Sequence, residues 1–98
     1  MIKGNWETRQ VYINEDQLDP KQSQMVFNHS PDGFNWSYSG SGPAQLALAL
    51  LLRFIRDDEI AVKHHQAFKD DVIASLPEGD FELSEKVVWD WIEKNITA

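Results

Sequence analysis

The residues whose types and spacing could support chemistry lie close together in the stretch 39–45, which reads Ser-Gly-Ser-Gly-Pro-Ala-Gln. Such a turn ahead of a helix can bind an anion, because free backbone N–H groups and the helix dipole both favour negative charge there. The spacing departs from nucleotide-binding motifs, since no Lys and Ser/Thr pair follows the last glycine and Gln45 stands where a dinucleotide fingerprint needs Gly or Ala. Pro43 also removes one N–H donor. The turn therefore indicates a small-ligand or anion site at most, with the candidate residues Ser41, Gly42, Ala44, Gln45, Trp36 and Tyr38.

Other reactive residues show no catalytic or metal-binding spacing. His64 and His65 are adjacent, so on a helix they point about 100° apart and would not share one ion with Asp57 and Asp58. His29 has no acid or nucleophile linked to it by spacing, and the serines of the turn do not form a nucleophile elbow. The chain has no cysteine, which excludes disulfides and thiolate chemistry. We expect no catalytic residue, no metal and no cofactor, and a non-enzymatic role is favoured over an enzymatic one.

The element that must position this turn is the helix that follows it. Pro43 suits a first helical position, and residues 46–52 are all Ala or Leu, both strong helix formers. With Gly42 as the N-cap, Gln45 lies where a capping box places Glu or Gln, so its side chain would reach back to the Gly42 N–H. A helix that is apolar on every side must be covered on every side or lie in a membrane, and this run is far shorter than the roughly 20 residues of a membrane span. We predict a buried central helix at about 43–56.

The remaining pattern predicts an α+β fold in a single domain, 1–98. Short alternating or β-branched runs predict a three-stranded antiparallel sheet, and capping signals predict helices on one face of it. Asp before Pro predicts a short helical turn at 18–23, residues 80–83 are expected to be extended, and Ser84 is expected to cap the last helix. The predicted strands are Arg9–Ile13, Met25–Asn28 and Phe34–Tyr38, and the predicted helices are the central one, one at about 60–76 and one after Ser84.

The aromatic residues allow two interpretations. Phe34, Trp36 and Tyr38 would share one face of the third predicted strand, where they pack into the core or form an exposed ladder for bases or sugars. The core interpretation is favoured, because aromatic stripes beside a buried helix are usually core. On the last helix Trp91 falls in the apolar stripe, whereas Trp89 lies on another face and is expected to be partly exposed.

The charge of −7 and pI of about 4.7 argue against direct binding to nucleic acid or to an anionic membrane, both of which need clustered Lys and Arg. No apolar run of signal-peptide length stands at the N-terminus, so a cytoplasmic location is expected. The acids are more numerous in the second half, where they could imitate nucleic-acid phosphates toward a basic protein partner. Homodimerisation is a further hypothesis, because one short chain has few helices and strands with which to cover an all-apolar helix. The predicted partner-binding residues are Asp57, Asp58, Asp70, Asp71 and Trp89.

The run 30–51, with the pattern SPDGFxWxYxGSGPAQLALALL, resembles a small family of uncharacterised proteins from phages, plasmids and prokaryotic genomes. The family pattern usually has Gly where this chain has Ser37 and Ser39, and the resemblance covers roughly two-thirds of the chain with a specific motif. It implies no catalytic residues, because the family is known only as a domain of unknown function. We therefore expect a non-enzymatic protein-interaction module, an accessory or counter-defence factor of a mobile element that binds a host protein. The alternative is a small-ligand or anion-binding domain, with enzymatic activity as one form of it, that uses the glycine-rich turn.

Overall fold

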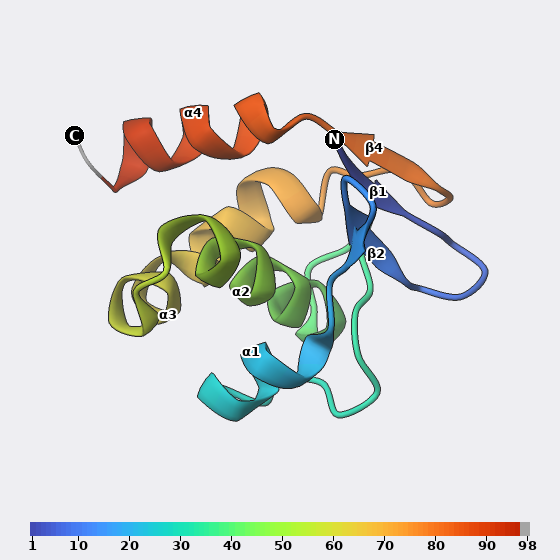
Figure 1. Cartoon of the computed structure of the whole chain (residues 1–98), viewed down its shortest axis with the longest axis horizontal. Coiled ribbons are helices and arrows are strands. Elements are labelled where there is room, and N and C mark those ends of the chain that lie inside the picture. Colours follow the sequence, from blue (N-terminus) through green and yellow to red (C-terminus); the bar gives the residue numbers. More distant parts are fainter. Residues whose placement is uncertain (97–98) are drawn as a thin grey trace.

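The computed structural model describes residues 1–96 and shows an α+β fold, in which helices pack beside one antiparallel sheet (Figure 1). Within these residues the sheet has four short strands in the order β3-β2-β1-β4. In Figure 1 the sheet stands to the right of the helices, with α1 below α2 and α4 above it. The strands are β1 (Ile2–Gly4), β2 (Val11–Ile13), β3 (Asp16–Gln17) and β4 (Phe81–Leu83), and the helices are α1 (Pro20–Val26), α2 (Ser41–Ile55), α3 (Asp58–Phe68), the π-helical turn η1 (Lys69–Ile73) and α4 (Glu85–Asn95).

The predicted buried helix is confirmed as α2. Every residue from Gly42 to Leu51 is buried, and α1, α3 and η1 all pack against it. The helix begins at Ser41 after the N-cap Gly40 and ends at Ile55, and its C-cap Arg56 has a left-handed backbone with a φ of 58°. Full burial of each leucine contributes about 2 kcal/mol relative to leaving it exposed, so this helix supplies much of the core.

The sheet has β1 at its centre, where Ile2 pairs with Ile13 of β2 on one side and with Leu83 of β4 on the other. These three side chains are buried, and the neighbouring Lys3 is exposed, as period-two alternation requires. Gly4 lies against the ring of Phe81, where a Cβ would collide with it. The extended segment predicted at 80–83 is confirmed as β4, whereas β1 and β3 were not predicted.

Two predicted strands are wrong. Met25 and Val26 form the end of α1, because the helix that Asp19 caps at Lys21 N continues past the predicted turn. Phe34–Tyr38 is irregular rather than extended, because Ser37 takes a positive φ of 76° and donates its N–H to Ile73 O instead of to a strand.

Other boundaries shift by a few residues. The first predicted strand begins at Val11 rather than Arg9, since Arg9 has a φ of 62°. The helix predicted at 60–76 begins earlier, at Asp58, and changes at Lys69 into η1. Ser84 caps α4 as predicted, its Oγ accepting a hydrogen bond from Lys86 N. Among the described residues no helix combines the length and apolarity that crossing a membrane requires.

Candidate functional site

Gln45 is the polar centre around which the motif region is assembled. Its side chain is completely buried in the first half of α2, which the sequence fills otherwise with apolar residues. The Oε1 atom accepts hydrogen bonds from His29 N at 2.7 Å and Ser30 N at 3.0 Å. The Nε2 atom donates to Ser23 Oγ at 2.9 Å and to Phe27 O at 3.1 Å. Gln45 therefore fastens α1 and the loop after it to α2. The predicted capping box with Gly42 is wrong, because the N-cap is Gly40 and both polar atoms of the Gln45 side chain bind α1 and this loop.

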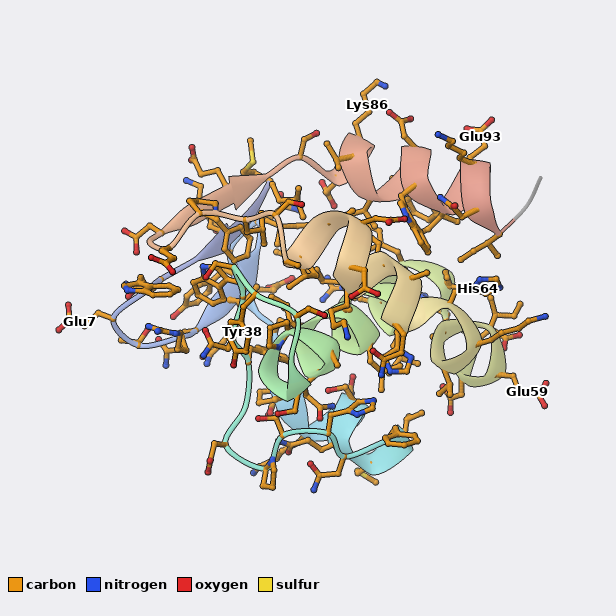
Figure 2. The ribbon with its side chains drawn as sticks, turned by 180° about the vertical axis from the view of Figure 1, so that it is seen from behind. Glu7, Tyr38, Glu59, His64, Lys86 and Glu93 are labelled. Atoms are coloured by element: carbon orange, nitrogen blue, oxygen red, sulfur yellow. The ribbon has the colours of Figure 1, made fainter. Side chains whose placement is uncertain are left out.

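The fastened loop brings His29 against His65 of α3. Their Nε2 atoms are 2.8 Å apart, and His65 Nδ1 lies 2.6 Å from Val62 O. A carbonyl oxygen can only accept, so His65 carries its proton on Nδ1 and its Nε2 accepts from His29 Nε2–H. The His29 ring also stacks on Phe27, with centroids 4.3 Å apart. His65 is buried, and the adjacent His64, labelled at the edge of the molecule in Figure 2, is only partly buried, as expected for two neighbours that point about 100° apart on a helix.

Burial favours the neutral form of this histidine pair. Desolvation lowers the pKa of His65 below 6.5, with Lys69 acting in the same direction and the hydrogen bond to Val62 O opposing them. The pKa of His29 is lowered first by burial, then by the charges of His65 and Lys69. A neutral pair can keep the single Nε2–H hydrogen bond, whereas a proton on His65 Nε2 would remove its acceptor.

The candidate ligand residues of the turn are not all accessible. Trp36, Gly42, Ala44 and Gln45 are buried, while Ser41 is exposed and Tyr38 keeps 48% of its surface in solvent. A Cβ on Gly42 would come within 2.6 Å of the Cβ of Asn35, so Asn35 covers the first turn of α2. Figure 2 labels Tyr38 next to this turn. A ligand here would meet Ser41 and Tyr38, and the anion site stays a prediction.

The core interpretation of the aromatic residues holds for two of the three. Phe34 and Trp36 are buried, and Trp36 packs edge-on against Phe81 with centroids 4.8 Å apart. The Trp36 Nε1–H donates to Gly79 O at 2.9 Å, which satisfies the one polar atom of this buried ring. Tyr38 lies outside the core.

The four predicted partner-binding aspartates lie at the two ends of α3 and η1, roughly 20 Å apart along the helix axis. Asp57 caps α3 by accepting from Ile60 N, and Asp58 follows in the first turn. Asp70 accepts from Ser39 Oγ, and Asp71 accepts from Trp91 Nε1–H at 2.8 Å. Three of these carboxylates thus stabilise local structure, and the four do not form one patch.

Trp89 differs from every other tryptophan in this chain by its exposure. It keeps 49% of its surface in solvent, whereas Trp91 on the same helix keeps 8%. Its ring meets Phe54 of α2 edge-on, with centroids 5.3 Å apart and an interplanar angle of 88°. Lys86 and Glu93 point away from the body of the protein on the outer side of α4 (Figure 2).

A groove of about 630 Å³ opens between α1 and the C-terminal half of α2. Its apolar lining comes from Leu18, Val26, Ala49 and Leu52. Polar residues complete it, among them Asp19, Arg53, Arg56 and Asp58. This groove is separate from the glycine-rich turn, which is at the other end of α2.

Comparison with known proteins gives one family. The model of the DUF6166 family, described as a family of unknown function, matches residues 3–94. The chain belongs to the DUF6166 family. The expected resemblance to a family of unknown function is confirmed over residues 3–94. No curated protein matches the chain, and no solved structure matches it.

Two features of this DUF6166 protein were outside the reach of sequence reasoning. His29 and His65 are 36 residues apart, so no spacing rule could pair them. The groove needs the crossing of α1 over α2, which depends on tertiary packing. One signal was present for Gln45, because a lone polar residue in an apolar helix needs buried hydrogen-bond partners.

Proposed function

We propose that this DUF6166 chain is a non-enzymatic protein-interaction module and that Trp89 is the centre of its contact surface. In this proposal the protein works in the cytoplasm as an accessory or counter-defence factor of a phage or other mobile element and binds a host protein. The observation that carries the proposal is the exposure of the Trp89 indole. Tryptophan is strongly enriched among residues that dominate binding energy at protein interfaces.

The surroundings of Trp89 support this interpretation. Phe54 fixes the ring from below by its edge contact, so little side-chain freedom is lost when a partner covers it. The chain continues from Phe54 through the end of α2 to Asp57 and Asp58. These carboxylates add negative charge at the same end of α2, where they would speed the approach of a basic partner rather than supply most of the affinity.

A comparison of matched variants tests the proposal. Tagged wild type, Trp89→Ala and Met25→Ala serve as baits in pull-downs from a bacterial lysate at low and at high salt. The proteins that each bait retains are quantified by mass spectrometry. Met25 is the control because it is an exposed apolar residue on α1, with 86% of its surface in solvent. Circular dichroism first confirms that both variants fold.

The proposal predicts a protein that wild type and Met25→Ala retain equally and that Trp89→Ala loses. High salt should weaken its retention without abolishing it, because the acids are a secondary contribution. Equal retention by all three proteins would contradict the role of Trp89. Complete loss in high salt would favour acidic mimicry over an aromatic contact. Light scattering of the purified chain tests for self-association, because a homodimer would have twice the mass of one chain and would cover a surface without any partner.

A further inference from the structure

The groove between α1 and α2 contains an arginine that the protein itself does not use. Of the three arginines, Arg9 lies over the Trp6 ring at 3.6 Å and donates to Asn35, and Arg53 lies 3.8 Å from Asp16. Within residues 1–96, Arg56 takes part in no side-chain hydrogen bond and no ion pair. A free guanidinium is unexpected beside a cavity in a chain with 16 acidic residues against 9 basic ones.

The backbone at Arg56 determines where its side chain leaves α2. Its left-handed conformation, with φ 58° and ψ 37°, ends α2 at a position where proteins commonly place glycine. This cap is satisfied by the structure itself, because Arg56 N donates to Leu52 O at 3.0 Å. It places the Arg56 side chain at the groove that opens beside the end of α2.

The rest of the groove specifies the kind of molecule that would fit. Leu18, Val26, Ala49 and Leu52 are the apolar part of its lining, and about 630 Å³ is within the usual size of a small-molecule site. Asp19 and Asp58 also line it and balance the charges of Arg53 and Arg56, so a nucleotide or other polyanion would be repelled more strongly than a ligand with a single carboxylate. A guanidinium matches a carboxylate through two parallel hydrogen bonds.

We propose that this groove is a binding site for a small amphiphilic carboxylate. The carboxylate pairs with Arg56, with Arg53 beside it, and the apolar chain lies along the apolar part of the lining. This site is independent of the Trp89 surface.

Titration with octanoate, followed by two-dimensional NMR of the backbone amides and arginine side chains, tests the site. The comparison ligands are acetate, which has the head group alone, 1-octanol, which has the chain alone, and AMP as a polyanion. The protein variants are Arg56→Gln and the control Lys94→Gln, which removes one positive charge from α4, outside the groove.

We expect saturable octanoate shifts at Leu18, Val26, Ala49 and Leu52, with weaker binding of acetate, 1-octanol and AMP. Arg56→Gln should weaken octanoate binding about tenfold, the typical effect of one charge-assisted hydrogen bond, while Lys94→Gln should leave it unchanged. Trp89→Ala should bind octanoate normally, so failure of the Trp89 proposal would leave this one standing. Absence of saturable shifts at the groove, equal affinity of Arg56→Gln and Lys94→Gln, or tighter binding of AMP would each overturn the proposal.

Discussion

Replacement of Gln45 by leucine should destabilise the protein by about 3 kcal/mol, a large part of the 5–15 kcal/mol that typically stabilises a domain. The change keeps the apolar volume in α2 but removes four hydrogen bonds. Ser23 Oγ still donates to Pro20 O, so three backbone groups lose their partner: His29 N, Ser30 N and Phe27 O. Each costs roughly 1 kcal/mol, the lower end of the range for an unsatisfied buried group, because the loop lies near solvent.

Gln24→Leu is the matched control, since Gln24 binds the same loop from outside. Its Nε2 donates to Ser30 O at 2.8 Å and Pro31 O at 3.3 Å, and water can replace it at both carbonyls. The expected loss is below about 1 kcal/mol. Urea unfolding followed by circular dichroism gives the free energy of unfolding of each variant. Equal slopes of this free energy against urea concentration show that unfolding exposes the same amount of surface in each variant.

Hydrogen exchange locates the effect. In Gln45→Leu the amides of His29 and Ser30 should exchange much faster than in wild type, because both lose their acceptor. The pKa of each histidine should also rise toward 6.5 when the loop loosens and the pair becomes hydrated. A loss below 1 kcal/mol with unchanged protection of these two amides would refute the assignment of Gln45 as the residue that fastens this loop.

The histidine pair and the glycines give two further predictions. The pKa values of His29 and His65 are lowered in the folded protein, so the unfolded chain binds protons more readily. The contribution of these two histidines to the free energy of unfolding should therefore be fully present above about pH 6.5 and should be lost as the pH falls below it. Unfolding midpoints at pH 7.5 and 5.5 measure this loss, and a His65→Phe variant that keeps the full loss would contradict it. Gly42→Ala should destabilise by about 1–3 kcal/mol, because its Cβ would lie 2.6 Å from that of Asn35. Gly79→Ala, whose Cβ meets nothing within 4 Å, should be neutral or stabilise by up to about 1 kcal/mol, and equal thermal shifts for the two variants would refute the role of close packing.

The central helix could be predicted from sequence because its signals are local and agree with one another. Proline at an early helical position, a run of strong helix formers and the lack of any solvated face all indicate one buried helix, and residues 42–51 are buried as expected. The caps at Asp57 and Ser84 are local in the same way, because each side chain binds an N–H only two or three residues ahead.

The sheet could not be predicted to the same extent, because its strands are too short to carry a pattern. β1, β2 and β4 have three residues each and β3 has two, so their pairing depends on contacts such as Ile2 with Leu83, 81 positions later. The segment 34–38 alternates like a strand, yet Trp36 is held by Gly79 O and Ser37 N by Ile73 O. Tertiary contacts of this kind override a local β preference.

Three residues of the motif region have structural roles inside the protein. Gly42 makes room for Asn35, Gln45 fastens the loop and Trp36 fills the core, so all three residues are buried and the polar atoms of Gln45 and Trp36 have partners inside the protein. A partner or ligand needs groups that the fold leaves available, and our two proposals rest on such groups near the opposite end of α2, the Trp89 indole and the Arg56 guanidinium. Exchange of either one should therefore affect binding more than the free energy of unfolding, whereas exchange of Gln45 should do the reverse.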